Sequence, residues 1–468
     1  MALTKQPKSI LSMTGRVFNE VISFIIFSVL DILDFVLCYT FKVLDFVIEA
    51  EWRTCYCSPT KQAITSSGKN IVCLLSSSKL QLEEISDTLY VRPSLVSGVS
   101  NYTDKELKRM KVETKVKQSC EKIKKGMVRS STFTFNSTIG KMFQRKGRNV
   151  RSHCIPRWSD CDCDTCHSWS YSCNDTLFVK VDGTRDNVQE DVIFIHGFIS
   201  SSRFWTETIF PNFSESAKSK YRLLAVDLLG FGRSPKPIDS LYTLGEHLNM
   251  IERSVLEKHK VKSFHIVAHS MGCILALALA FKYRRSIKSL TFVAPPYYPT
   301  PEGENAAQYM MRRVAPRRIW PIVSFGASMI CWYEHICRTI CLLICKNHRI
   351  WEFIANLITR KRIRTYLLEG FWCHTHNAAW HTLHNIICGT AAKIEGYLVV
   401  VKNMKCNVTI FHGIYDEIIP MECSYNVQAR VPRAKVKVIE NKDHITIVVG
   451  RQKAFAMELE EIWRNSNN

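Results

Sequence analysis

The chain has 468 residues, which is enough for one large domain with extensions or for two domains. Because 46% of the residues are hydrophobic, the chain can bury a large core, and a globally disordered protein is excluded. The formal net charge of +21 favours an anionic partner: a phospholipid surface, an acidic wall polymer or nucleic acid. The alternative is that one basic linker carries the excess charge. The 19 cysteines cannot all pair with one another, because their number is odd.

The amino-terminal residues, 1–60, are predicted to be a signal-anchor or membrane-associated segment. Residues 21–50 are strongly apolar, and their charged residues fall on one narrow stripe of a helix. On the membrane-insertion scale the apolar side chains of residues 21–39 contribute about −6 kcal/mol, whereas Asp31 and Asp34 each cost about 2.5 to 3.5 kcal/mol. Three arrangements fit this near balance: a signal-anchor with its stripe against a partner, a helix in the membrane interface, and a helix buried against the main domain. The stripe consists of Asp31, Asp34, Lys42, Asp45 and Glu49.

Residues 61–150 are predicted to be a linker region, which is polar and strongly basic from residue 101 onwards. The basic part is either a solvated helix and linker or a patch that holds an anionic surface. Nucleic acid is not expected as a partner, because no reading motif and no interleaved aromatic residues accompany the charge.

Residues 151–176 form a cysteine-rich segment that also contains His167. A zinc site is one interpretation, but a single residue separates Cys161 from Cys163, which is tight for two ligands of one tetrahedral ion, and a second C-x₂-C pair is missing. Local disulfides are the favoured alternative in a secreted chain, and no metal is expected. The cysteines are Cys154, Cys161, Cys163, Cys166 and Cys173.

Five N-x-S/T sequons support a secretory route, because chance alone gives about two or three in a chain of this length. One of them, at Asn407, opens an apolar strand and is a poor glycosylation site. The others are at Asn101, Asn136, Asn174 and Asn212.

Residues 177–468 alternate short apolar strands with helices, which predicts a mostly parallel sheet covered on both faces. Helices are predicted over Leu244–His259, Met271–Tyr283 and Gln452–Arg464. An insertion of about a hundred residues, approximately 299–405, interrupts the alternation and is predicted to be a helical cap or lid. The predicted strands are "LFVKV", "VIFIHG", "RLLAVDLLG", "FHIVAHS", "SLTFVAPP", "VTIFHG" and "KVKVIE".

Ser270 is the candidate nucleophile. It is the centre of "AHSMG", which differs from the G-x-S-x-G nucleophile elbow only by Ala268, a small residue where glycine is usual. An apolar strand precedes it and an apolar helix follows, as the elbow requires. The alternative is a serine that only caps the helix.

Asp416 and His444 complete a candidate catalytic triad. Each follows a late strand, and the order serine, acid, histidine is the chain order of α/β-hydrolases. His444 would take the proton of Ser270 and Asp416 would orient its imidazole, while Asp443 and Glu417 are weaker alternatives for the acid. The backbone N–H groups of Phe198, after "HG", and of Met271, after the serine, are the expected oxyanion hole. This chemistry needs no cofactor and no metal.

Several motifs together resemble an α/β-hydrolase of the epoxide-hydrolase-like branch: "HGF…W", "DLLGFGRSPKP", "AHSMG", "HGIYDEIIP" and "KDHIT". That branch often carries aspartate as nucleophile, so Ser270 implies ester chemistry instead. The apolar amino-terminal segment, "RWSDCDCDTC" and "FWCHTHNAAWHTLHNIICG" resemble more closely the plant BODYGUARD group of lysophospholipase-like proteins. This resemblance implies an α/β-hydrolase fold, with Ser270, Asp416 and His444 at the triad positions, in a membrane-anchored or secreted protein of cuticle or cutin formation. The cell surface or cell wall, or the endoplasmic reticulum, is its implied location.

Residues 310–368 of the insertion mix arginines with large apolar residues. They are either a cap helix packed on the core or an amphipathic lid that rests on lipid and admits an acyl chain. Four histidines follow and are interpreted as pocket lining or core residues rather than as metal ligands: His374, His376, His381 and His384.

The leading function is a serine hydrolase that acts on lipid acyl esters at a membrane or lipid surface. One alternative is an acyltransferase, similar to a cutin synthase, in which an alcohol rather than water receives the acyl group. A second alternative is a hydrolase-fold lipid receptor with little turnover. Labelling of Ser270 by a fluorophosphonate would separate the enzymes from the receptor.

Overall fold

The structure is a computed structural model that describes residues 10–49, 63–64, 70–71, 85–89, 157–164, 166, 176–183, 190–238, 240–358 and 365–466. These residues divide into two units. The helical unit contains α1 (Ile10–Glu49), a two-stranded pairing of β1 (Ala63–Ile64) with β2 (Asn70–Ile71), and residues Arg312–Thr339. The sheet unit contains the described parts of Glu84–Thr88, Val150–Met311 and Ile340–Asn468. The predicted insertion is therefore shared between the two units.

The sheet unit is built on seven strands in the order β3-β5-β4-β6-β7-β8-β9. All neighbours are parallel except β3, which pairs with β5 in the antiparallel direction at one edge. This arrangement confirms the predicted mostly parallel sheet, and each predicted strand is present. The strands are β3 (Val179–Asp182), β4 (Glu190–Ile195), β5 (Tyr221–Val226), β6 (Phe264–His269), β7 (Ile287–Val293), β8 (Asn407–Gly413) and β9 (Lys435–Ile439).

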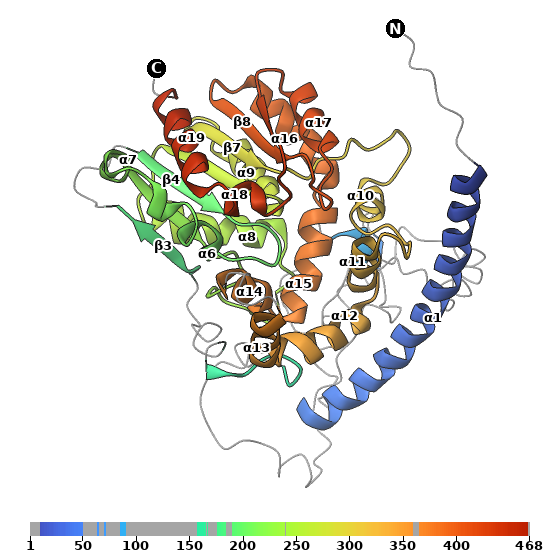
Figure 1. Cartoon of the computed structure of the whole chain (residues 1–468). Helices are drawn as coiled ribbons and strands as arrows, with labels where there is room; N and C mark the ends of the chain where they lie inside the picture. The colour runs from blue at the N-terminus through green and yellow to red at the C-terminus, as the bar shows by residue number, and fades with distance from the viewer. Residues whose placement is uncertain are drawn as a thin grey trace. The chain divides into compact units, whose positions relative to one another are not determined.

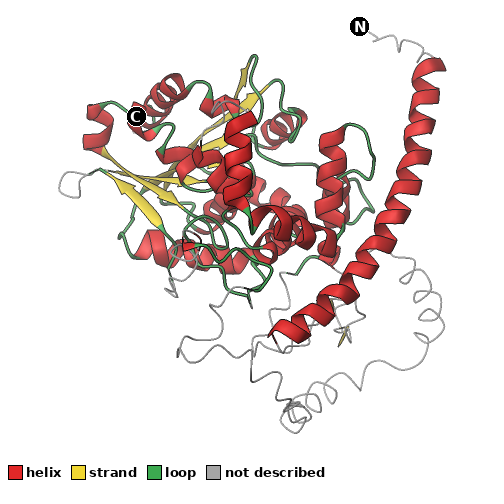
Figure 2. Cartoon of the chain, turned by 60° about the horizontal axis from the view of Figure 1, so that its bottom comes forward, coloured by secondary structure: helices red, strands yellow, loops and turns green. Residues whose placement is uncertain are grey.

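Helices cover both faces of the sheet, which explains why the central strands are apolar on both sides (Figures 1 and 2). Every residue of β5 and β6 is buried. On one face α6 (Arg203–Thr206), η3 (Phe210–Asn212), α7 (Glu215–Lys220), α18 (Thr446–Val449) and α19 (Gln452–Arg464) share an aromatic core with the strands. On the other face α9 (Met271–Lys282) packs against β4, β6 and β7 and against α8 (Leu244–Ile251) and α16 (Ala391–Asn403).

The predicted helix over Leu244–His259 continues from α8 into a π-helical segment, η4 (Glu252–Glu257). A capping box opens α8: the Thr243 hydroxyl accepts from the Glu246 amide, and the Glu246 carboxylate accepts from the Thr243 amide. The remaining short elements are η1 (Asp87–Leu89) and α17 (Glu422–Arg430), which packs against β9 and α16.

The described residues of the predicted insertion are mostly helical and lie between β7 and β8. In the sheet unit its helices contact the loops that follow β4 and β5. The amide nitrogens of Asn377 and Asn385 donate to the carbonyls of Ile238 and Leu241, respectively. The helices of the insertion are α10 (Ala306–Val314), α11 (Ile322–Trp332), α12 (Glu334–Ile340), η5 (Cys341–Cys345), α13 (His348–Ile358), α14 (Thr365–Trp372), α15 (His376–Thr382), η6 (Leu383–Cys388) and α16.

In the helical unit, the acidic stripe of α1 faces residues Arg312–Thr339 of the same chain. Asp45 forms two hydrogen bonds of 2.6 and 2.7 Å with the Arg338 guanidinium, and both side chains are 5% exposed. Asp34 accepts from the backbone amides of His335 and Ile336 at the start of α12. Asp31 lies 3.3 Å from Arg317. The stripe thus contacts a segment of the same chain, and these pairs offset the cost of the buried charges.

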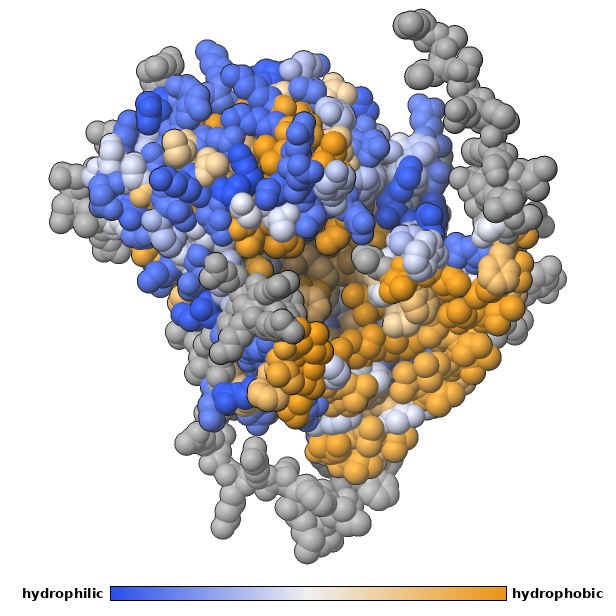
Figure 3. All heavy atoms as spheres, in the orientation of Figure 1, coloured by the Kyte–Doolittle hydropathy of each residue, from blue (hydrophilic) through white to orange (hydrophobic). Residues whose placement is uncertain are grey.

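The opposite side of α1 is apolar and exposed (Figure 3). Phe24 is 75% exposed and Val47 66%, and between them lie further exposed aliphatic and aromatic side chains. Residues Val17–Glu49 are long and apolar enough to cross a membrane. At 1.5 Å per residue the whole helix is about 60 Å long, roughly twice the thickness of a bilayer's hydrocarbon core.

Candidate active site

Ser270 lies on the sharp turn between β6 and α9, with φ 51° and ψ −122°. A positive φ is strained for a residue with a Cβ, and such strain is the mark of a nucleophile elbow. Its amide donates to the carbonyl of Val293 at the end of β7 (2.8 Å), which fixes the turn. Although Ser270 occupies the N-cap position of α9, its side chain makes no capping hydrogen bond. The alternative that the serine is present as a helix cap is therefore not supported.

Glycine is required beside this turn because the backbone of β4 passes close to it. A Cβ on Gly272 would lie 2.7 Å from the carbonyl oxygen of His196 and 2.8 Å from that of Ile195. A Cβ on Gly197 would lie 3.1 Å from the Cβ of Ser270. Ala268, at the first motif position, is fully buried in β6 with its methyl group accommodated. Of the two glycine positions of the motif, only the second, Gly272, must be glycine, because the backbone of β4 lies close to it.

Asp416 and His444 are brought together by the loops after β8 and β9. Asp416 Oδ2 lies 2.7 Å from His444 Nδ1, and the Asp416 side chain is 1% exposed. Oδ1 of the same carboxylate accepts from the amides of Ile418 and Ile419. The two loops approach so closely at Gly413 that a Cβ there would meet the carbonyl oxygen of Lys442 at 2.4 Å. These contacts hold the carboxylate and orient the imidazole.

Two further histidines support this pair from the buried side. His269 Nε2 donates to the carbonyl oxygen of His444 (3.0 Å), and the two rings are 4.6 Å apart between centroids. His412 Nε2 lies 3.5 Å from Asp416 Oδ2 and 2.8 Å from the carbonyl oxygen of Ile419. Burial lowers the pKa of both histidines, so both stay neutral at neutral pH.

The other acids considered for this role lie elsewhere. Asp443 is exposed, and its Oδ1 accepts from the amides of Ile445 and Thr446, which begins the turn into α18. Glu417 is exposed. Asp416 is therefore the carboxylate whose geometry suits His444.

The two amides predicted for an oxyanion hole lie at the same edge of the sheet as Ser270. Neither the Phe198 nor the Met271 amide donates to another group among the described residues. The Phe198 loop is held by His196, whose Nδ1 donates to the carbonyl of Gly197 (2.7 Å) while its Nε2 accepts from the Leu228 amide (3.0 Å). Burial lowers the pKa of His196, which keeps the ring in this neutral form.

Ser270 Oγ and His444 are not hydrogen-bonded in the described structure. Ser270 directly follows His269, whose ring contacts His444, so both side chains belong to one carboxyl edge of the sheet. Catalytic hydrogen bonds are often long before substrate binds and shorten in the complex. The geometry thus pairs the imidazole with the carboxylate at the edge of the sheet that also carries Ser270.

A second set of serine, histidine and acid, missed by the sequence reasoning, lies at the opposite edge of the same strands. Ser289 Oγ is 2.7 Å from His265 Nδ1, and His265 Nε2 is 3.0 Å from Glu190 Oε2. These residues stand near the amino ends of β7, β6 and β4. Ser289 and His265 are fully buried. The one available signal was that His265 and Ser289 lie at the start of predicted strands and Glu190 just before another.

The expectation of local disulfides in the cysteine-rich segment is wrong for its described cysteines. Cys161, Cys163 and Cys166 are free thiols, and they gather around His348, a residue of the insertion that sequence spacing could not connect to them. Cys154, Cys173 and His167 lie outside the described residues. Of the four insertion histidines, His376, His381 and His384 are buried, as predicted, whereas His374 faces Cys341 and Cys345.

Comparison with known proteins agrees with this architecture. A family model for the alpha/beta hydrolase fold matches residues 192–450. "Probable lysophospholipase BODYGUARD 3" of Arabidopsis thaliana is 55% identical, over 98% of this chain and 99% of the relative. "Probable lysophospholipase BODYGUARD 1" of the same plant is 54% identical, over 97% of both chains, and BODYGUARD 2 is 53% identical, over 97% of this chain and 99% of the relative.

The fold and the residues at the carboxyl edge of the sheet define the class of an α/β hydrolase. The chain belongs to the α/β-hydrolase fold family and, within it, to the BODYGUARD group.

Proposed function

We propose that the chain is a serine ester hydrolase that cleaves acyl esters of lipids, with Ser270 as nucleophile, His444 as general base and acid, and Asp416 as the orienting carboxylate. The observation that carries the proposal is the 2.7 Å contact between His444 Nδ1 and Asp416 Oδ2, at the edge of the sheet where Ser270 stands on a strained turn. Membership of a family whose relatives are named lysophospholipases supports ester hydrolysis.

The reaction follows from the roles of these groups. With Nδ1–H donating to Asp416, Nε2 of His444 would accept the proton of Ser270 as Oγ attacks the ester carbonyl. The negative charge that develops on the carbonyl oxygen would be stabilised by the amides of Phe198 and Met271 and by the positive end of α9. As the carbonyl re-forms, the ester bond breaks and His444 protonates the departing alcohol. Water, deprotonated by His444, then cleaves the acyl-enzyme and releases the fatty acid.

The insertion is proposed to act as a lid over this site. Its helix α14 lies against the loop that carries Phe198, since a Cβ on Gly370 would be 3.3 Å from the Ser201 hydroxyl and Arg203 forms an ion pair with Glu369. Its helix α13 exposes a row of apolar side chains: Ile350, Trp351, Phe353, Leu357 and Ile358. Such a face suits contact with lipid.

Hydrolysis of a monoacyl phospholipid, with release of fatty acid, tests the proposed reaction. We expect Ser270→Ala to lower kcat/KM by about 10³-fold or more, because the nucleophile is lost while binding remains. Ser289→Ala is the matched control, since this fully buried serine also contacts a histidine, His265 Nδ1 at 2.7 Å, but lies at the opposite edge of the sheet from His444 and Asp416. Equal turnover by Ser270→Ala and the unaltered chain would overturn the proposal.

Repeating the assay with a hydroxy fatty acid present measures where the acyl group goes. A new ester in place of free fatty acid would identify transfer to an alcohol, as in a cutin synthase. Binding of lipid without any Ser270-dependent product would identify a receptor.

We also propose that α1 attaches the protein to a membrane through its exposed apolar side. Two substitutions on this side, Phe24→Asp and Val47→Asp, are expected to reduce co-sedimentation with phospholipid vesicles, since each places a charge in lipid. Phe281→Asp is the control, because Phe281 is 53% exposed in the sheet unit. Equal loss of vesicle binding in the control would contradict the role of α1.

We further propose that the reaction serves cuticle or cutin lipid formation at the plant cell surface, which the chain would reach by way of the endoplasmic reticulum. Membership of the BODYGUARD group and the apolar α1 support this location. The test is a glycosidase-sensitive mass together with a tagged chain at the cell surface. Asn212 and Asn407 are poor glycan sites, since their side-chain amides donate to the carbonyls of Thr208 and Asn465. The sequons at Asn101, Asn136 and Asn174 lie outside the described residues. A cytosolic, unglycosylated chain would contradict this proposal.

A further inference from the structure

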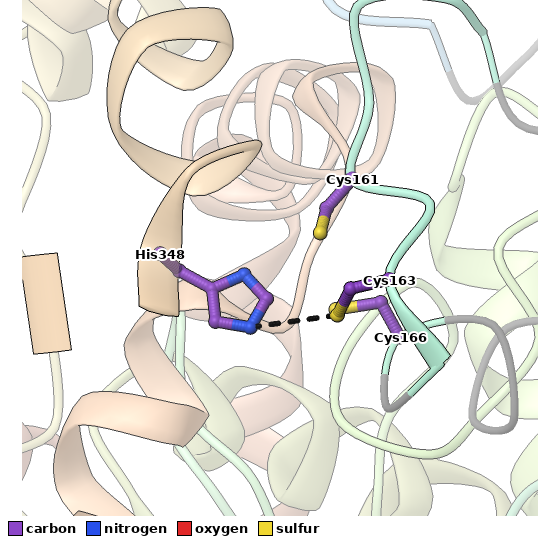
Figure 4. Close-up of side chains that lie close together, drawn as sticks. All are labelled: Cys161, Cys163, Cys166 and His348. Atoms are coloured by element: carbon purple, nitrogen blue, oxygen red, sulfur yellow. Dashed lines mark hydrogen bonds between the residues drawn. The ribbon is translucent and has the colours of Figure 1, made fainter. Parts of the chain in front are cut away.

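The cysteine-rich segment ahead of β3 brings three thiols and one imidazole to a single point (Figure 4). Cys161, Cys163 and Cys166 come from this segment, and His348 is the first residue of α13. Their Sγ and ring nitrogen atoms all lie within 4.8 Å of one another. Cys166 and His348 are buried, and the other two are half-buried. Four soft donors therefore converge from two segments that are far apart in the chain.

The histidine is already held in the form that a metal requires. Its Nδ1 lies 2.9 Å from the backbone carbonyl oxygen of Cys345 and therefore donates to it. In a neutral imidazole the proton is then on Nδ1, and Nε2 carries a lone pair. Nε2 is the atom that faces the thiols, 3.8 Å from Cys163 Sγ. A carbonyl that fixes the tautomer and the ring orientation is the usual support of a metal-bound histidine.

We propose that Cys161, Cys163, Cys166 and His348 bind one Zn²⁺ ion in a structural site. With Zn–S and Zn–N distances of about 2.3 and 2.0 Å, a tetrahedral site separates sulfur from nitrogen by about 3.5 Å and sulfur from sulfur by about 3.8 Å. The 3.8 Å contact between Cys163 and His348 is close to the first value.

The donor set selects the ion and its role. Thiolate and imidazole ligands favour zinc over magnesium or calcium, which prefer oxygen. Four protein ligands complete the tetrahedron and leave no position for water, which is the arrangement of a structural rather than a catalytic site. Three thiolates around a divalent ion leave one negative charge. Lys346, whose ammonium donates to the carbonyl of Trp158, supplies a positive charge beside it.

A neighbouring group, Cys341, Cys345 and His374, is a weaker candidate. His374 Nε2 lies 3.9 and 3.8 Å from the two thiols, but this group offers three ligands among the described residues. It is therefore the natural comparison in a test of the four-ligand site.

The ion would join the segment that leads into β3 to helix α13 of the cap. An ion that joins these two segments closes the chain between them into a long loop, which restricts the unfolded chain. A metal that binds only the folded form also stabilises that form. Because α13 carries the exposed apolar row from Ile350 to Ile358, the site would also fix the helix that is proposed to face lipid. The role is independent of the proposed ester chemistry.

Metal analysis of the full chain tests the site. The protein should be purified without a polyhistidine tag and without chelators, and its zinc measured by plasma mass spectrometry. We expect about one zinc per chain, and less than about one fifth of that in Cys163→Ser and in His348→Asn. Cys406→Ser and His374→Asn are the controls and should keep the metal, since Cys406 is a buried thiol outside both groups.

X-ray absorption at the zinc edge of the unaltered chain covers the case in which a variant does not fold. Three sulfur neighbours at about 2.3 Å and one nitrogen at about 2.0 Å would support the site. Several results would overturn it: no stoichiometric zinc in the unaltered chain, a disulfide among the three cysteines by peptide mapping, zinc retained in His348→Asn, or zinc lost in His374→Asn.

Discussion

Among the described residues, a set of serine, histidine and acid lies at each edge of the sheet, and the surroundings of Ser270 differ from those of Ser289. At the amino edge, Ser289, His265 and Glu190 are joined by hydrogen bonds of 2.7 and 3.0 Å. At the carboxyl edge, His444 and Asp416 are paired, but Ser270 is not yet bonded to the imidazole. A ranking by hydrogen bonds alone would choose the set at the amino edge.

The backbone distinguishes the two serines. Ser270 stands on a turn with φ 51°, at the start of α9, beside amides that donate to no described group. Ser289 lies within β7, paired with His265 of β6 and Asn407 of β8, and is fully buried. A nucleophile needs a strained turn and donors for the developing charge. The two sets thus differ in the environment of the backbone more than in the identity of their three side chains.

The substitutions Asp416→Asn and Glu190→Gln should show the largest difference in kcat between the two edges. With an amide beside Nδ1, the imidazole of His444 is no longer held in the correct tautomer, and we expect kcat to fall by about 10³- to 10⁴-fold. Glu190→Gln should leave kcat within about twofold. The measurement is ester hydrolysis at saturating substrate. A loss in the Glu190 variant as large as that in the Asp416 variant would reverse the assignment of the two edges.

Gly272→Ala tests the close packing beneath the elbow. The new methyl group would press on the carbonyl oxygens of His196 and Ile195, which lead into the Phe198 loop. Because small displacements of oxyanion donors are costly, we expect kcat to fall by about 10- to 100-fold. Gly396→Ala, where nothing lies within 4 Å of the new Cβ, should keep full activity and gain up to about 1 kcal/mol of helix stability. Unchanged kcat in Gly272→Ala would show that the elbow tolerates this shift.

Ser289→Ala should affect stability rather than catalysis. It leaves Nδ1 of the buried His265 without its partner, which costs about 1 to 3 kcal/mol in the free energy of unfolding. Urea denaturation measures this loss, and kcat/KM measured in parallel should stay within about twofold. A tenfold fall in kcat/KM with no loss of stability would assign a catalytic role to the amino edge.

The pH dependence of stability provides the smallest test. Burial lowers the pKa of His265, so its imidazole stays neutral in the folded chain while the unfolded chain binds a proton below about pH 6.5. Stability therefore falls as the pH drops below that value, by up to about 1.4 kcal/mol per pH unit for this one group. In His265→Gln the difference in unfolding free energy between pH 7.5 and pH 5.5 should be smaller by about 1.4 kcal/mol. An identical difference in both proteins would contradict a neutral His265.

The sequence predicted the sheet and the candidate residues of the carboxyl edge because local signals specify them. Apolar runs marked each strand, and Ser270, Asp416 and His444 each follow one. Long-range pairing carries no such signal. His348 lies close to Cys161 in space although the two are far apart in the sequence, and the same is true of Arg338 and Asp45. Spacing within one segment could therefore suggest disulfides near Cys161 but could not identify a fourth ligand.

The acidic stripe of α1 shows the same limit. Its alignment on one helical face followed from the helical period, and a partner was one of three arrangements that fitted it. The identity of that partner, residues Arg312–Thr339, required the structure. Periodicity predicts that one face of a helix carries the charged residues, whereas tertiary contacts determine which segment that face packs against.

The most direct test of the two-edge account is to label the chain with a fluorophosphonate and locate the adduct by peptide mass spectrometry. We expect one adduct, on Ser270, that is absent from Ser270→Ala and unchanged in Ser289→Ala. An adduct on Ser289, or no adduct on Ser270 in a folded chain, would contradict it.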